Sequence, residues 1–326
     1  MSQPLSENGA QRAKPATLDA RVDPLRRWSD GSRELVSTPT FSIGRHILPT
    51  KHDEWGQERC LGTNPIVAFS TTPIEATFEG NWPAMLDRST VATPPAGAGY
   101  KRVPVTEQGH VVSWISATPE TMAEIVAHRD ESARTNPNAP FSLATTPTDI
   151  IASAGMTWLS QMLFGSHSQI DPMQLDESAI TILDRIAFRS AECLGKRTTQ
   201  RGATRRKHRE IANETCKLIA TRFGEKLSIS DLSSLLGLSP AYLSRVFRWN
   251  TGQSIHQHLI CTRLLHAMDM LGSNRGSLAW VAARCGFASH AHLTSSCTTL
   301  LGSPPSGLDL KDARRNLTLL LTRKAG

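Results

Sequence analysis

Residues 227–254 read LSISDLSSLLGLSPAYLSRVFRWNTGQS, and this stretch decides the fold of the C-terminal third of the chain. Ser228 opens a capping box, whose acidic partner three residues later favours the positive end of the helix dipole. Gly237 ends this short helix, and Ser239 caps the next one with Pro240 at its first helical position. Two short helices joined by a tight glycine turn predict a helix-turn-helix.

Apolar residues recur at helical spacing in both of these helices, so each helix should bury one face. The opposite face of the second helix is polar and basic, which is typical of a helix that enters a groove of DNA. The residues expected to point inward are Leu232, Leu235, Leu236, Leu243, Val246 and Phe247, and those expected to point outward are Ala241, Ser244, Arg245 and Arg248.

The same pattern recurs further along the chain. Ser277 caps another short helix, Gly286 ends it, and a second helix is expected from about Ser289 to Leu301 with Leu293 and Cys297 inward. One long helix is expected between the two units, over residues 255–271. A rigid connector of this length would hold two recognition helices about one DNA turn apart, roughly 34–36 Å.

The balance of charged residues changes sign near residue 196, just before the helix-turn-helix units. From Lys196 onward there are 20 Lys and Arg against 7 Asp and Glu, a balance of +13, and the preceding residues carry −6, which gives the net +7. An acidic N-terminal part and a strongly basic C-terminal part indicate that the C-terminal part binds a polyanion. Residues 196–209 (KRTTQRGATRRKHR) lack an apolar stripe, so we expect a basic hinge that is solvated or touches phosphates.

This combination of residues resembles the AraC/XylS transcription regulators over roughly residues 211–310. The resemblance implies a regulator that reads two adjacent major-groove segments of promoter DNA beside RNA polymerase. It rests on Leu227-Ser-Ile-Ser-Asp-Leu232, Gly237-Leu-Ser-Pro240, Tyr242-Leu-Ser-Arg-Val-Phe-Arg248, Gly252-Gln-Ser254, Arg263-Leu264, Ala267, Leu271, Val281-Ala282, Gly286-Phe287, Ser289, Gly302 and Pro305.

By matching position, the resemblance also implies which residues face DNA. They are Ala241, Ser244 and Arg245 in the first unit, and His290, Ala291, Thr294 and Ser295 in the second. We expect Ser239 and Arg248 to belong to the same DNA-binding surface.

The second unit departs from the family pattern. The family usually has arginine at position 295, a basic residue at 298 and an aromatic residue at 297, where this chain has Ser295, Thr298 and Cys297. Without bidentate arginine contacts to guanine, this helix should discriminate bases poorly. We therefore expect Arg245 and Arg248 to dominate DNA binding.

The N-terminal half has a different character. Short runs of β-formers separated by turn residues predict an all-β sandwich or barrel. The β-rich block that ends in Ala92-Thr-Pro-Pro-Ala-Gly-Ala-Gly-Tyr100 loosely resembles the cupin-like jelly-roll sensor half of the same family. That resemblance implies a small-molecule effector or a homodimer. The runs are residues 40–48, 65–71, 74–78 and 110–116, and the aromatic residues that either line a pocket or fill the core are Trp55, Phe69, Phe78, Trp82, Tyr100 and Trp114.

The resulting domain plan joins a β-rich N-terminal part to an all-α C-terminal part. Helices expected at 149–163 and 172–194 either pair between subunits or pack on the β domain. The plan has a disordered tail at 1–20, a β-rich regulatory domain at 21–130, a helical linker with the basic hinge at 131–210, a DNA-binding domain at 211–312 and a basic tail at 313–326.

We expect no enzyme activity, no metal and no other cofactor. The six cysteines contain no C-x-x-C pair, so they are interpreted as buried, reduced thiols. His46, His52 and His110 lack the spacing of a cupin metal site. A metal-dependent cupin-type enzyme and a regulator that sequesters a partner without strong DNA binding remain as alternatives. A polar start and the lack of long apolar runs predict a cytoplasmic protein without a membrane anchor.

Overall fold

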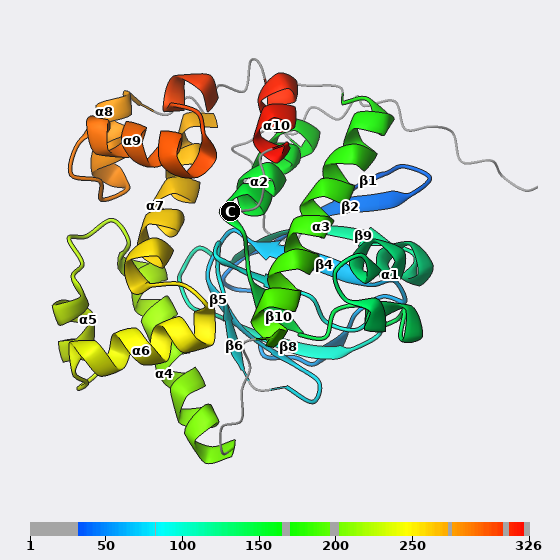
Figure 1. The fold of residues 1–326 in the computed structure, drawn as a ribbon, viewed down its shortest axis with the longest axis horizontal. Coiled ribbons are helices and arrows are strands. Elements are labelled where there is room, and N and C mark those ends of the chain that lie inside the picture. Colours follow the sequence, from blue (N-terminus) through cyan, green and yellow to red (C-terminus); the bar gives the residue numbers. More distant parts are fainter. Residues whose placement is uncertain are drawn as a thin grey trace, which may run out of the picture.

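The computed structural model describes residues 32–81, 83–164, 170–195, 202–272, 276–308 and 313–322. The expected disordered tail at residues 1–20 lies outside these ranges. Two antiparallel β-sheets form the N-terminal part, and the C-terminal part is helical (Figure 1). This is the fold class that the sequence predicts.

Strands β2 to β9 pair in a nested order, in which the first meets the last and the middle two meet each other. This is the order of a jelly roll, where one long antiparallel hairpin wraps into two sheets. The pairs are β2 (Phe41–Leu48) with β9 (His110–Ala117), β3 (Arg59–Cys60) with β8 (Gly99–Pro104), β4 (Ile66–Ser70) with β7 (Thr90–Ala92), and β5 (Ile74–Phe78) with β6 (Ala84–Leu86).

Two further strands extend the larger sheet at its edges, β1 (Ser32–Ser37) beside β2 and β10 (Thr145–Pro147) beside β7. The sequence placed the whole β domain before residue 130, so β10 is a correction. Its three residues, Thr-Thr-Pro, are too short to show alternation, and proline is tolerated there because the strand lies at an edge.

The register of the larger sheet places Gly44 opposite Trp114. The indole lies over the glycine, and a Cβ atom at residue 44 would lie 2.1 Å from its ring carbon. Only glycine leaves room for this ring, which is a reason for a glycine inside a strand.

Helices α1 (Pro119–Ala127), α2 (Ile150–Phe164) and α3 (Pro172–Gly195) share one apolar core with the larger sheet. Thr118 caps α1 by accepting a hydrogen bond from the backbone amide of Thr121. Packing on the β domain, one of the two roles that the sequence left open for α2 and α3, is therefore what the structure shows.

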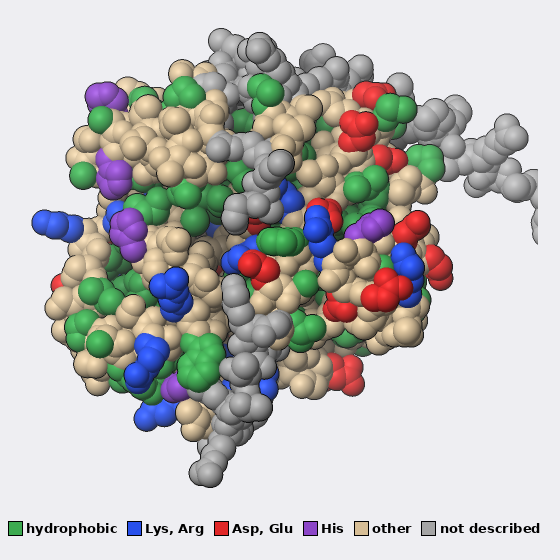
Figure 2. Space-filling view, viewed as in Figure 1, with side chains coloured by type: hydrophobic (Ala, Val, Ile, Leu, Met, Phe, Trp, Pro, Cys, Tyr) green, Lys and Arg blue, Asp and Glu red, His purple; other side chains and the backbone are tan. Residues whose placement is uncertain are grey.

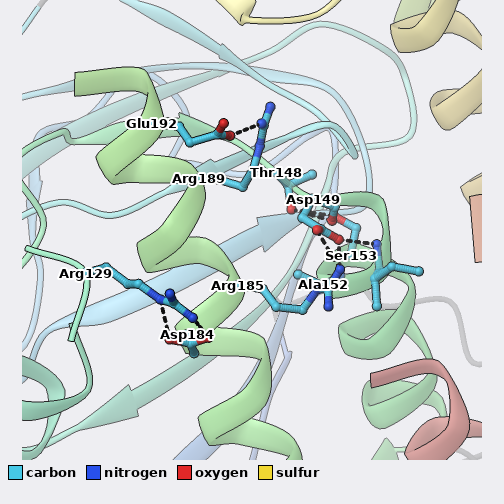
Figure 3. A network of polar contacts seen from close by, with 10 residues as sticks. Arg129, Thr148, Asp149, Ala152, Ser153, Asp184, Arg185, Arg189 and Glu192 are labelled. Atoms are coloured by element: carbon cyan, nitrogen blue, oxygen red, sulfur yellow. Dashed lines mark hydrogen bonds and ion pairs between the residues drawn. The ribbon is translucent and has the colours of Figure 1, made fainter. Parts of the chain in front are cut away.

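Ion pairs fix α3 to its neighbours (Figure 3). Arg185 pairs with Asp149 at 2.7 Å, and Asp149 also accepts from the backbone amide of Ala152 at the start of α2. Arg129, just after α1, donates from both Nε and Nη2 to Asp184 at 2.9 Å. These pairs set the positions of α1 and α2 along α3.

The remaining helices form the C-terminal part, with α7 running between two smaller helical units (Figure 1). None of the described helices has the length and apolar character that crossing a membrane requires. The helices are α4 (Gly202–Arg222), α5 (Ile229–Leu235), α6 (Pro240–Thr251), α7 (Ile255–Gly272), α8 (Leu278–Arg284), α9 (His290–Leu301) and α10 (Ala313–Leu321).

The basic hinge expected at 196–209 is in part wrong. Residues 202–209 are the first turns of α4, and residues 196–201 lie outside the described ranges. Arginine and lysine are good helix formers, and Arg206 pairs with Glu210 one turn later at 2.9 Å. His208, which is 8% exposed, anchors this end of α4 against the rings of Tyr242 and Trp249.

The basic tail expected at 313–326 is also corrected. Residues 313–321 form α10, which contacts α2 and α3. Leu317, Leu320 and Leu321 are buried in the core shared with the jelly roll. These leucines lie on one face of a helix, and burial of that apolar face stabilises the helix against the core.

Leu235 was expected inside but is 55% exposed, because α5 buries only Leu232 and Ser233. On α3, Ala179 is buried beside Leu183, and Ile180 is 44% exposed. Helical periodicity predicts the buried face of a helix only to within about one residue. It therefore cannot decide whether a residue at the edge of that face is buried.

Candidate nucleic-acid interface

The first helix-turn-helix unit consists of α5 and α6. Its capping box forms as predicted: Ser228 Oγ accepts from the amide of Asp231 at 3.1 Å, and the Asp231 carboxylate accepts from the amide of Ser228 at 2.8 Å. Gly237 turns the chain with a φ of +65°, a conformation that favours glycine. Ser239 then caps α6 by accepting from the amide of Tyr242 at 3.3 Å.

The two faces of α6 separate as the sequence predicts. Leu243, Val246 and Phe247 are fully buried. On the opposite face, Arg245 and Arg248 are exposed, and the structure places the remaining predicted contact residues beside them. Ser239 and Ala241 are exposed, and Ser244 is half-buried.

Tyr242 on α6 restricts the side chain of Arg245. The Arg245 guanidinium carbon lies 5.6 Å from the centre of the Tyr242 ring, within reach of a cation–π contact. The Tyr242 hydroxyl lies 3.2 Å from Nε2 of His208 on α4. A guanidinium held over a fixed ring loses less freedom when it binds a base or a phosphate.

The second unit, α8 and α9, repeats the frame of the first. Ser277 and Ser289 accept from the amides of Trp280 and His292 at 3.3 and 3.1 Å. Gly286 turns with a φ of +77°, and a Cβ atom there would lie 2.6 Å from the carbonyl oxygen of Phe223. Leu293, Cys297 and Leu301 form the buried face of α9.

The outer face of α9 carries no Lys or Arg. His290, Ala291 and Ser295 are exposed, and Thr294 is half-buried. The hydroxyls of Thr294 and Thr298 each donate at 2.9 Å to a backbone carbonyl one turn earlier in the helix. Their protons are therefore used inside the helix, which leaves their oxygens as acceptors.

Charged side chains are unevenly distributed over the surface. Lys, Arg and His gather over the helices of the C-terminal part, whereas Asp and Glu gather over the N-terminal part on the opposite side of the view (Figure 2). This separation agrees with the acidic front and basic back of the sequence. The basic side contains the outer face of α6.

Sequence reasoning missed how the two parts of the chain join. The connection around β6, residues 83–89, lies against α4 and α7. Asn213 on α4 donates to the carbonyl of Pro83 at 2.9 Å, and Arg88 forms an ion pair with Asp269 on α7. Nothing in the local pattern of residues 83–89 indicates these partners, because they lie more than a hundred residues away in the chain.

At the centre of this junction lies a buried polar cluster of Asp87, Cys216 and His258. One ligand-type atom from each residue lies within 4.8 Å of the others. His258 Nε2 is 3.1 Å from the Asp87 carboxylate. Desolvation alone would lower the pKa of His258, but the acidic groups of Cys216 and Asp87 beside it raise this pKa to about 10.

The prediction that all six cysteines are buried thiols is right for three of them. None of the six forms a disulfide bond, and Cys216, Cys285 and Cys297 are buried. Cys60 is exposed because β3 is a two-residue strand without a buried face, and Cys193 and Cys261 are half-buried at helix surfaces.

The jelly roll encloses a second feature, a cavity of about 430 Å³. Of the aromatic residues in question, Phe78, Tyr100 and Trp114 line it. Trp55 and Phe69 do not line it, and Trp82 lies outside the described residues. His46 and His110 also line this cavity, whereas His52 does not.

A buried arginine dominates the polar end of this cavity. Arg102 is 4% exposed, and its Nη atoms reach Nδ1 of His110 at 3.1 Å and the Glu54 carboxylate at 2.7 Å. Its Nε has no hydrogen-bond partner among the described residues. Burial, reinforced by the charge of Arg102, holds the pKa of His110 well below its ordinary value, so the imidazole is neutral.

Comparison with known proteins bears mainly on the C-terminal part. Residues 232–309 match a family model described as a helix-turn-helix domain. The Msm operon regulatory protein of Streptococcus mutans is 27% identical over 94 residues, which are 29% of this chain and 34% of that protein. The probable transcriptional regulator LumQ of Photobacterium leiognathi is 28% identical over 82 residues, 25% of this chain and 33% of that protein.

Among solved structures, the DNA-binding domain of AdpA in complex with a target DNA is 30% identical to this chain. That match covers 29% of this chain and 86% of that domain, with a TM-score of 0.28, too low to bear on the whole molecule. The chain spans about a third of the length of the two curated relatives. Together with the repeated caps, glycine turns and buried faces, the matched region identifies residues 232–309 as a helix-turn-helix domain of the AraC type.

Proposed function

We propose that this chain is a transcription regulator that binds double-stranded promoter DNA through α6 and α9. The observation that carries the proposal is the outer face of α6, where Arg245 and Arg248 are exposed on a helix whose opposite face is completely buried. Arginine on a recognition helix binds guanine bidentately in the major groove. Action at a promoter would bring the protein beside RNA polymerase.

The contact residues divide into two roles. Arg245 and Arg248 would dominate the contacts to base edges or phosphates in the first segment of the site, with Ser244, Ala241 and the cap Ser239 beside them. On α9, His290, Ala291, Thr294 and Ser295 would add backbone contacts or read the shape of the DNA. Most of the sequence discrimination would then come from one half of the binding site.

Genome-wide mapping of the bound sites, followed by titration of the full chain with the recovered duplex, tests this proposal. We expect the duplex to be preferred over bulk competitor DNA, with an affinity that falls steeply as salt increases. The absence of any preference at low salt would reject DNA recognition and favour the sequestration of a protein partner.

We further propose that the jelly-roll cavity binds a small effector. Its lining is largely apolar, and one polar end is marked by the neutral His110 and by the Nε of Arg102, which has no hydrogen-bond partner in the described part of the chain. These features suit an apolar molecule that carries an oxygen acceptor. A ligand at a concentration of 100 times its Kd would stabilise the folded protein by about 2.7 kcal/mol.

A thermal-shift screen tests the effector proposal with pairs of compounds that differ by a single carbonyl or carboxylate group. We expect only the acceptor-bearing member to stabilise the protein, and we expect Arg102→Gln to abolish the difference. Equal stabilisation by both members would place the ligand elsewhere.

A further inference from the structure

We propose that Asp87, Cys216 and His258 bind a divalent transition-metal ion of the Zn²⁺ class at the junction between the jelly roll and the first helix-turn-helix unit. The site combines one oxygen, one sulfur and one nitrogen ligand, a set that zinc accepts in proteins. This inference contradicts the expectation from local spacing that the chain binds no metal. It does not depend on the proposed DNA recognition.

The three residues come from three different elements. Asp87 directly follows β6, Cys216 lies on α4 and His258 lies near the start of α7. All three are nearly inaccessible, with exposed fractions of 3%, 5% and 1%. These ligands are far apart in the sequence, so no sequence motif indicates them. Only the packing of residues 83–89 against the helices brings them together.

The geometry is close to that of a metal site. Zinc bonds of about 2.0–2.2 Å to nitrogen and oxygen place two ligand atoms about 3.3–3.6 Å apart in a tetrahedron. The distance from His258 Nε2 to the Asp87 carboxylate oxygen is 3.1 Å. A small outward movement of either side chain would therefore accommodate the ion between them.

Supporting contacts already orient two of the ligands. The second oxygen of Asp87 accepts from the backbone amide of Ser89 at 2.8 Å, so the other oxygen is turned toward His258. Nδ1 of His258 lies 2.9 Å from the amide nitrogen of Gln253, and this contact turns the other ring nitrogen, Nε2, toward the cluster. Metal-bound histidines donate a hydrogen bond from their second nitrogen, so metal binding would require the Gln253 amide to turn its oxygen toward Nδ1.

Charge also fits a divalent ion. A buried site must be close to neutral, and one thiolate and one carboxylate together balance a charge of +2. Burial raises the pKa of the Cys216 thiol, and a bound cation would ionise it.

A fourth position remains for water or an exchangeable ligand. Cys216 and His258 both line a cavity of about 510 Å³ between the two parts of the molecule. Sites with three protein ligands and one open position exchange their fourth ligand. Because Asp87 belongs to the jelly roll and the other two ligands belong to the helical part, metal occupancy would strengthen the junction.

Metal binding by the reduced full chain tests the site directly. We expect chelator-treated protein to take up one equivalent of Zn²⁺ after dialysis, measured by elemental analysis. With Co²⁺ we expect the charge-transfer absorption that a cobalt–thiolate bond produces. Failure of the wild-type protein to bind either ion would overturn the proposal.

Variants assign the ligands. Cys216→Ser should remove the cobalt–thiolate absorption, and Asp87→Asn, which keeps the shape of the side chain, should weaken Zn²⁺ binding at least tenfold. Cys193→Ser is the matched control, because Cys193 lines the same cavity but lies outside the cluster. Unchanged binding in Asp87→Asn would reject the site even if the cysteine variant did not fold.

Discussion

The two helix-turn-helix units share a frame but not a surface. Helices α6 and α9 each have 12 residues, begin at a serine cap and end at a glycine in the left-handed conformation. On their outer faces, Ser295 stands where the first unit has Arg245, and Thr298 where it has Arg248. The caps and the buried face specify the fold of such a unit, and the outer face can therefore change without affecting that fold.

The two units also differ in what they pack against. Leu243 and Phe247 of the first unit belong to a small core that includes Met85 of the jelly roll. Leu293 and Cys297 of the second unit belong to the large core that continues through α2 and α3. The unit with the basic surface is thus attached through a smaller core, and the unit with the neutral surface is part of the main body.

The largest expected difference concerns stability. Phe247→Ala removes a fully buried ring and should cost about 3–5 kcal/mol, whereas Cys297→Ala removes only a sulfur atom at the matching position and should cost much less. Denaturant unfolding of both variants measures the two losses. Similar losses would show that the large core around Cys297 tolerates a small cavity worse than the structure suggests.

The next difference concerns binding. Arg245→Ala should weaken operator binding by about 1–3 kcal/mol, because it removes a cationic donor that can contact bases or phosphates. Ser295→Ala at the matching position should change the affinity much less. Titration at fixed salt measures both, and equal losses would reverse the ranking of the two units.

The serine caps should behave alike despite the unequal surfaces. Ser239→Ala and Ser289→Ala each remove one side-chain acceptor of a helical amide, at a cost of about 0.5–2 kcal/mol in stability. Thermal unfolding of the pair checks this expectation. If the two variants are equally stable but Ser239→Ala loses clearly more DNA affinity than Ser289→Ala, the Ser239 hydroxyl contacts a phosphate directly.

The smallest effect is expected from restoring a charge. Ser295→Arg places a guanidinium on the exposed face of α9, where a solvated charge contact contributes about 0–1 kcal/mol. The slope of affinity against salt should steepen by about 1 if the new side chain reaches a phosphate. An unchanged slope would mean that α9 does not face the DNA backbone at this position.

The helices of the two units could be predicted in detail because their signals are local. Serine caps, glycine turns and apolar spacing act within a few residues, and from Ser228 to Gly302 the structure reproduces the caps, the turns and, apart from Leu235, the main buried positions. Strands rich in β-formers, such as β2, were predicted for the same reason.

Contacts between distant segments could not be predicted in this way. The pairing of β10 with β7, the helix begun by residues 202–209 and the burial of α10 depend on surfaces made by other parts of the chain. The cluster of Asp87, Cys216 and His258 is the clearest case, since each residue alone resembles an ordinary core residue. For the outer faces of α6 and α9, the exposure matches the sequence prediction, and DNA contact remains a proposal.

The burial of α10 determines when the apolar surface of α2 can be covered as the chain folds during synthesis. Leu321 packs so closely on α2 that a Cβ atom on Gly155 would lie 2.8 Å from it. During synthesis, α2 emerges long before α10, and both helix-turn-helix units are translated in between. The apolar surface of α2 that α10 covers therefore stays open until these units have been made, and this interval is when the nascent chain is most exposed to aggregation.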